Sequence, residues 1–159
     1  MNLYLLRHAK TEKSATSGKD FDRKLAEKGI KQANLFSSYL KEKTIENVEV
    51  WCSTAARTRK TALLINAEKV LSKITYKDEL YLASLQELLA QIWESDSDKD
   101  LFIIGHNEGL SELASYFSGN NILLQTCGYI HLQIEAQSRK EWSKDLAQII
   151  DLYRPEIIT

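Results

Sequence analysis

Two arginines and two histidines stand where apolar stretches of the sequence end. Arg7 and His8 follow one such stretch, His106 follows another, and Arg57 comes shortly after a third. Guanidinium groups are permanently charged, forked donors that suit phosphate oxygens. An imidazole surrounded by such cations stays neutral, and therefore nucleophilic, because its protonated form is disfavoured. One histidine could attack phosphorus while the arginines hold the charge of the transferred group, so these residue types indicate phosphoryl transfer.

The apolar stretches before these residues predict buried strands. Residues 3–6 are apolar on both faces, as in a central parallel strand, and "DLFIIGH" has the same character. "GYIHLQIE" alternates instead, which is typical of a half-covered strand. Strands are predicted at residues 3–6, 48–53, 100–106, 128–135 and 147–154.

Helices are predicted between these strands. The clearest one has Leu85, Leu88, Leu89, Ile92 and Trp93 at the spacing of a single buried helix face. Helices are predicted at residues 25–43, 54–68, 85–93 and 110–117, the last closed by Gly119. The alternation of strands and helices predicts an α/β fold, a three-layer α/β/α sandwich with a mostly parallel central sheet.

Ligands bind such folds at the carboxyl ends of the strands, where loops and helix N-termini converge. Three predicted strands end in Arg7-His8, in Ser53-Thr54 with Arg57 shortly after, and in Gly105-His106-Asn107. If these strands are parallel neighbours, both histidines and both arginines meet at one edge of the sheet. The helix N-termini there add backbone N–H groups that favour an anion. A cation in a first helical turn, as at Arg57, is unfavourable unless an anion binds beside it.

The composition is that of one domain, residues 1–159, with 43% hydrophobic content and a net charge of −1. No basic block or basic amphipathic helix is present, so neither nucleic acid nor a membrane is expected as a partner. The N-terminus lacks a signal-peptide layout, and the apolar runs are far shorter than the roughly 18 residues of a membrane span. We expect a cytoplasmic monomer in which Cys52 and Cys127 are buried, reduced thiols.

At these residues the sequence resembles the histidine phosphatase superfamily, also called phosphoglycerate mutase-like. The motifs that carry the resemblance are "LLRHAKT" at 5–11, "CSTAARTRKTA" at 52–62 and "IIGHNEGLSEL" at 103–113, in the family's order. "DFDRKLAEKGIKQA" at 20–33 is similar to the region after the first motif in the short bacterial SixA-type branch. The resemblance spans nearly the whole chain and implies a phosphoglycerate mutase-like fold.

The resemblance also implies roles for the motif residues. His8 would be the nucleophile that forms a phosphohistidine intermediate, and His106 would bond the phosphoryl group. Arg7 and Arg57 would clamp the phosphate. The implied reaction needs no metal and no other cofactor.

Two neighbouring residues complete the expected site. Thr11 stands where the family often carries a hydroxyl near the pocket, and Asn107 directly follows His106. We expect both to bind the substrate.

The sequence departs from the family's pattern at the general acid. Many members carry Glu or Asp between the second and third motifs, at the place where this chain has Leu82. Glu79 is a possible general acid that lies close but out of register, as does Asp78. Expelling an alkoxide needs a proton donor far more than cleaving a P–N bond does. We therefore expect the substrate to be a phosphorylated histidine in a phosphohistidine domain of a partner protein.

Two other functions are left open by the sequence. One is a small-molecule phosphomonoesterase of the same family, which would act on a small phosphorylated metabolite. The other is a non-catalytic phosphate-binding module. A binder would have little need of an imidazole placed for attack, so the presence of both His8 and His106 favours an enzyme. Whether the polar loop 12–24 gates the site is also left open.

Three further signals favour structural roles. Cys52 and Arg57 are one residue short of the Cys-x5-Arg loop of cysteine phosphatases. "DSDKDL" at 96–101 begins like a calcium loop, but the glycine and the glutamate expected at its sixth and twelfth positions are missing. His131 lies among the polar-facing positions of its predicted strand, so we expect it to be structural.

Overall fold

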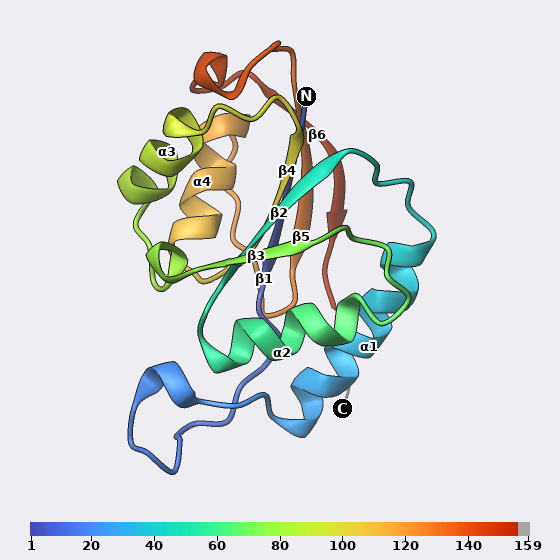
Figure 1. Cartoon of the computed structure of the whole chain (residues 1–159), viewed down its shortest axis with the longest axis vertical. Helices are drawn as coiled ribbons and strands as arrows, with labels where there is room; N and C mark the ends of the chain where they lie inside the picture. Colours follow the sequence, from blue (N-terminus) through green and yellow to red (C-terminus); the bar gives the residue numbers. More distant parts are fainter. Residues whose placement is uncertain (156–159) are drawn as a thin grey trace.

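A computed structural model of the chain describes residues 1–155, which form a mixed β-sheet between two layers of helices (Figure 1). The strands are β1 (Asn2–Arg7), β2 (Val48–Ser53), β3 (Ile74–Lys77), β4 (Asp100–Gly105), β5 (Tyr129–Ile134) and β6 (Ala147–Tyr153). Their order across the sheet is β3-β2-β4-β1-β5-β6. β3, β2, β4 and β1 are parallel neighbours, and β5 is antiparallel to both β1 and β6. The predicted, mostly parallel sheet is confirmed.

Helices cover both faces of the sheet. α1 (Glu27–Lys41) and α2 (Ala56–Ile65) pack together on one face, and α3 (Leu85–Glu94) and α4 (Gly109–Ser118) pack together on the other (Figure 1). Single turns of 3-10 helix lie at η1 (Asp20–Asp22), η2 (Asp78–Leu80) and η3 (Arg139–Glu141). This is the predicted three-layer sandwich. Within residues 1–155, no helix has both the length and the apolar character that crossing a bilayer requires.

The side chains of β1 enter both layers of the core. Leu3 and Leu5 belong to the hydrophobic cluster beneath α3 and α4, whereas Tyr4 and Leu6 belong to the cluster beneath α1 and α2. None of the four is more than 5% exposed. A strand covered on both faces has no polar side, which explains why the apolar run is unbroken until the strand reaches the edge of the sheet.

Each strand and helix predicted from the sequence is present, with ends that differ by a few residues. α1 begins at Glu27 because Leu25 pairs with Thr11 in an isolated antiparallel bridge and Ala26 is extended. β3 was not predicted. It is a short edge strand whose side chains are all at least partly exposed, so its sequence lacks the alternation that identifies a half-buried strand.

The chain that follows β1 is held in place by α1 and α2. Gly29 of α1 passes so close to Lys10 that a Cβ atom there would lie 2.0 Å from the Lys10 carbonyl oxygen. The Gln32 side chain accepts a hydrogen bond from the Lys10 N–H (2.9 Å), and the Thr61 hydroxyl accepts one from the Ala9 N–H (3.1 Å). These contacts fix the backbone directly after the first histidine.

Candidate active site

The predicted residues meet at the carboxyl ends of β1, β2 and β4. Arg7 pairs with Gly105 in the sheet register, so the ends of β1 and β4 lie side by side. Arg7, His8, Arg57 and His106 line one hollow of about 340 Å³. Side chains from distant parts of the sequence thus surround a single space at the edge where ligands of α/β sheets bind.

His8 is 7% exposed and its imidazole is held in one orientation. Its Nδ1 lies 2.8 Å from the main-chain oxygen of Ala9. Because a carbonyl oxygen only accepts hydrogen bonds, Nδ1 carries the hydrogen and Nε2 has the lone pair. Burial lowers the pKa of His8 to about 4; the hydrogen bond to Ala9 opposes this shift, and three nearby arginines add to it. His8 is therefore neutral at neutral pH, with Nε2 available as a nucleophile.

His106 lies beside His8, with 5.4 Å between the two ring centroids. Its Nε2 is 2.8 Å from the hydroxyl oxygen of Ser53 at the end of β2. Burial, followed by the effects of His8 and Arg57, lowers the pKa of His106 to about 3. Its Nδ1 is buried and has no hydrogen-bond partner among residues 1–155. One nitrogen of a neutral imidazole is thus left unused by the described protein.

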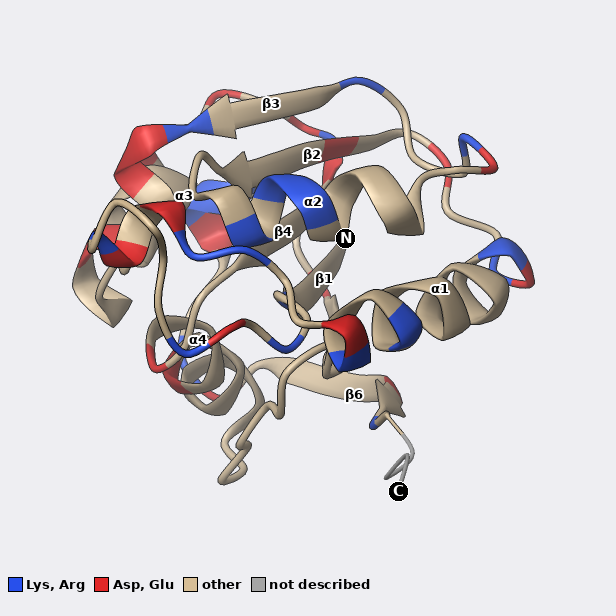
Figure 2. Ribbon diagram, turned by 90° about the horizontal axis from the view of Figure 1, so that it is seen from below, with Lys and Arg blue, Asp and Glu red and all other residues tan. Residues whose placement is uncertain are grey.

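Both arginines donate to oxygen atoms at the hollow. Arg7 donates through Nη1 to the main-chain oxygen of Leu124 (3.0 Å). Arg57 donates through Nη1 to the main-chain oxygen of Asp20 (2.8 Å) and through Nη2 to the Asp20 carboxylate (3.0 Å). Figure 2 shows the basic residues of α2 next to the segment between β1 and α1, which supplies Asp20. The Nε atoms of both arginines are buried and have no partner in the described chain.

Asp20, Arg23 and Tyr81 form a network at the hollow that was not identified from the sequence. The Asp20 carboxylate accepts hydrogen bonds from the Tyr81 hydroxyl (2.5 Å) and from Arg23 Nη1 (2.9 Å), in addition to Arg57. The bond from Tyr81, with further help from the arginines, holds the pKa of Asp20 well below its usual range. The only sequence signal was the "DFDRK" segment after the first motif, and charged residues in a polar loop are more often simply solvated.

Thr11 and Asn107, the two predicted substrate-binding residues, line the same hollow, and their polar atoms are held by neighbours. The Thr11 hydroxyl accepts a hydrogen bond from Arg23 Nη2 (2.6 Å). The Asn107 amide donates to the main-chain oxygen of Leu124 (2.9 Å) and accepts from the Ser111 hydroxyl (2.8 Å). Both side chains are therefore fixed in orientation, and Thr11 holds Arg23 at the edge of the hollow.

Glu79, the possible general acid, does not line this hollow. It is exposed and borders a separate hollow of about 390 Å³ together with Trp51 and Lys77. Leu82, at the place of the family's acid, does line the hollow that contains His8. Among the described residues the only carboxyl group in that lining is Asp20, which is ionised at neutral pH.

Other candidate centres have structural explanations. Within residues 1–155, no group of three or more His, Cys, Asp or Glu side chains is arranged to hold a metal ion. Cys52 and Cys127 are free and buried, and burial raises the pKa of both thiols to about 12, so neither is a thiolate nucleophile at neutral pH. His131 stacks on Tyr4 with 4.4 Å between centroids, and its Nε2 lies 2.7 Å from Asn2 Oδ1.

Comparison with known proteins identifies the family. Residues 3–101 match the family described as Histidine phosphatase superfamily (branch 1). The matched region contains the first two motifs and the end of β1 that carries Arg7 and His8. The chain belongs to branch 1 of the histidine phosphatase superfamily, a family of phosphatase enzymes.

Individual relatives extend this likeness. A Mycobacterium leprae protein is 29% identical over 102 residues, which make up 64% of this chain and 62% of that one. A candidate phosphohistidine phosphatase SixA from Agrobacterium tumefaciens is 26% identical, with a TM-score of 0.79 over 97% of this chain and 98% of the other. The protein histidine phosphatase SixA solved with tungstate is 16% identical, with a TM-score of 0.77 over 96% of each chain.

The fold also extends to proteins named for a small substrate. A candidate α-ribazole-5′-phosphate phosphatase from Escherichia coli is 15% identical, with a TM-score of 0.69 over 100% of each chain. Fold alone therefore does not choose between protein and small-molecule substrates.

Proposed function

We propose that the chain is a metal-independent phosphatase that works through a covalent phosphohistidine on His8. The observation that carries the proposal is the hollow in which a neutral His8, with its lone pair on Nε2, lies beside His106 and two arginines. Charge on the transferred phosphoryl group would meet the guanidinium groups of Arg7 and Arg57. If the Ser53 hydroxyl donates to Nε2 of His106, Nδ1 of that ring carries a hydrogen for a phosphoryl oxygen.

The proposed reaction has two displacements at phosphorus. First, His8 Nε2 forms a bond to phosphorus while the bond from phosphorus to the leaving group breaks, and the leaving group departs with that electron pair. Then water attacks the phosphohistidine, the P–N bond breaks, and its electron pair returns to His8. Inorganic phosphate keeps the oxygen of the water, and the proton lost by the water stays on phosphate. His8 is regenerated as a neutral imidazole.

The substrate that we propose is phosphohistidine on a partner protein. A phosphorylated imidazole with a proton on its second nitrogen leaves as neutral imidazole, so it needs no acid, whereas an alkoxide must be protonated. Asp20 has no proton to give at neutral pH, and Leu82 occupies the position of the family's acid. The lack of a placed acid among the described residues supports a P–N substrate. The names of the SixA-type neighbours agree with this choice.

We also propose that the protein acts in the cytoplasm. Its two cysteines are free, and a reducing compartment keeps thiols in that state.

Substrate preference tests the proposal. We expect kcat/KM for a phosphohistidine peptide to exceed that for sugar phosphates by at least about 100-fold, because only the esters need the missing acid. His8→Ala should remove turnover of every substrate, while His131→Asn, a histidine variant outside the site, should retain it. A preference for sugar phosphates would instead support a small-molecule phosphomonoesterase. Equal turnover by the wild type and His8→Ala would contradict catalysis by His8 altogether.

A further inference from the structure

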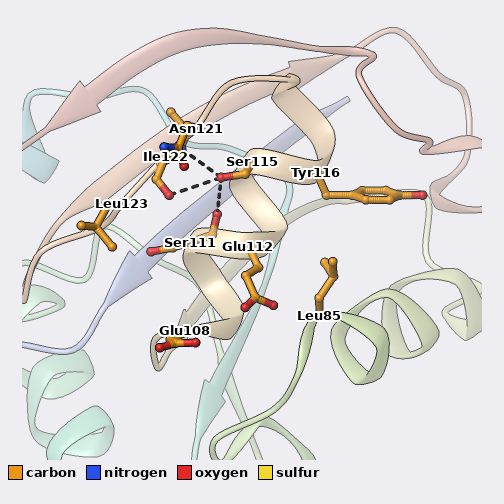
Figure 3. Close-up of a pocket in the computed structure, with 9 residues that line it drawn as sticks. All are labelled: Leu85, Glu108, Ser111, Glu112, Ser115, Tyr116, Asn121, Ile122 and Leu123. Atoms are coloured by element: carbon orange, nitrogen blue, oxygen red, sulfur yellow. Dashed lines mark hydrogen bonds between the residues drawn. The ribbon is translucent and has the colours of Figure 1, made fainter.

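A second hollow, of about 560 Å³, lies beside the catalytic one along α4. Figure 3 shows Glu108 directly before this helix and Glu112 on it, with Leu85 of α3 on one side and Leu123 of the α4–β5 connection on the other. The hollow is here termed the α4 groove and is defined by these four residues and Tyr116.

The α4 groove borders the catalytic hollow along two stretches of chain. Asn107 lines the catalytic hollow, and the next residue, Glu108, lines the groove. Likewise Leu82 lines the catalytic hollow, and Leu85, three residues later, lines the groove. The two hollows are thus adjacent along the chain, and a partner protein that presents a phosphoryl group to His8 is large enough to cover both.

Each of the two hollows has a largely exposed leucine in its lining. Leu123 is 74% exposed and Leu82 is 53% exposed. Leu82 also has a φ of 50°, in the left-handed region that residues other than glycine adopt at an energetic cost. Leu123 precedes Leu124, whose main-chain oxygen accepts a hydrogen bond from Arg7.

The α4 groove has a charge opposite to that of the catalytic hollow. Glu108 and Glu112 are exposed, and neither forms an ion pair with any residue of the described chain. They are four residues apart and repel each other at the start of α4, where the N-terminus of the helix partly offsets the repulsion. A simple sugar phosphate offers only negative charge and gains nothing from these carboxylates. A protein can present a phosphoryl group and, some residues away, a lysine or arginine.

We propose that the α4 groove docks the partner protein that carries the phosphorylated histidine. The partner surface that fits has a Lys or Arg to pair with Glu108 and Glu112, and an apolar side chain to cover Leu123. This inference rests on the proposed function, because it concerns how the substrate of that reaction is selected. The groove would thus make the enzyme select a protein substrate over small phosphate esters, which can reach the same nucleophile.

Three phosphohistidine probes test the docking surface. The first is a helical peptide with leucine and lysine side chains one turn from its phosphohistidine, the second has glutamate in place of the lysines, and the third is free phosphohistidine. We expect the wild type to have a kcat/KM for the lysine peptide at least about 10-fold above that for the glutamate peptide. In Glu108→Gln/Glu112→Gln this ratio should fall to about 1 or below, since no carboxylate is left in the groove to attract the lysines. Leu123→Ser should lower kcat/KM for both peptides but not for free phosphohistidine.

Matched variants control for general effects on the surface. Glu68→Gln and Leu63→Ser change an exposed glutamate and an exposed leucine (64% exposed) outside the groove, and they should leave all ratios unchanged. Turnover of free phosphohistidine without any preference between the peptides would overturn the proposal that the groove is a docking surface, and it would leave the proposed function intact. Peptide ratios that are the same in the groove variants as in the wild type would also overturn it. Failure to hydrolyse any of the three probes would overturn both proposals.

Discussion

His8 can act as a nucleophile only while Nε2 keeps its lone pair. Its pKa is lowered from 6.5 to about 4, so the neutral form is present above that pH and is lost as the pH falls through it. An NMR titration of the imidazole protons should therefore give a midpoint near 4 for His8 and near 3 for His106. A midpoint at 6.5 or above for His8 would contradict the burial of a neutral imidazole among cations.

The same shift makes the stability of the protein depend on pH. In the unfolded chain a histidine gains its proton as the pH falls through 6.5, whereas folded His8 stays neutral down to about 4. The unfolded state then binds more protons, so the free energy of unfolding decreases as the pH drops across this window and is fully retained above it.

Asp20 bonds the guanidinium group of Arg57, which we propose binds the phosphoryl group of the substrate. Arg57 directs both Nη atoms at Asp20, so a bound phosphate must compete with this carboxylate. Asp20→Asn removes the competing charge and should lower the inhibition constant of inorganic phosphate by about 3- to 10-fold. Asp22→Asn is the matched control, because Asp22 lies on the same turn but bonds the Ser17 hydroxyl. Weaker phosphate inhibition in Asp20→Asn would show that Asp20 supports the anion site instead of competing for it.

At the scale of elements, the contact between α1 and the chain after β1 determines where His8 lies. A Cβ atom on Gly29 would meet the Lys10 carbonyl oxygen at 2.0 Å, and a backbone atom cannot rotate away as a side chain can. Gly29→Ala should therefore lower the free energy of unfolding by about 2–3 kcal/mol and reduce kcat/KM, which urea unfolding and kinetic assays would measure. Asn34→Ala, at an exposed position of α1, should change neither quantity appreciably. Wild-type stability in Gly29→Ala would mean that α1 does not hold this segment.

The sequence predicted the elements because each pattern reports a local environment. Residues 3–6 are apolar throughout because β1 is covered on both faces, and the half-covered β5 alternates. The arginines and histidines could be expected at one edge since all of them follow predicted strands. β3 could not be predicted because an exposed edge strand has no apolar pattern.

Long-range pairings were beyond the reach of sequence patterns. The bonds of Asp20 to Arg57 and to Tyr81 join positions 37 and 61 residues apart, and no local pattern encodes them. The possible role of Glu79 depended on which way the β3–α3 connection turns. In the structure that connection places Leu82 at the hollow that contains His8 and Glu79 at another one.

At the scale of the whole molecule, two helical layers cover the faces of the sheet, and the loops that follow the strands form the site (Figure 1). The proposed catalytic hollow and the α4 groove have neighbouring residues of the chain in their linings and differ in charge, one lined by arginines and the other by glutamates. A cationic site for a phosphoryl group next to an acidic, partly apolar surface favours a macromolecular substrate over a small anion.

Detection of the phosphoenzyme tests the central claim most directly. After rapid mixing with a phosphohistidine peptide and quenching in alkali, peptide mapping by mass spectrometry should find a phosphoryl group on His8 alone, and phosphorus NMR should place it on Nε2. The intermediate should be absent from His8→Ala and present in His131→Asn. Turnover by the wild type with no phosphorylated His8 at any reaction time, or with the label on another residue, would contradict the account.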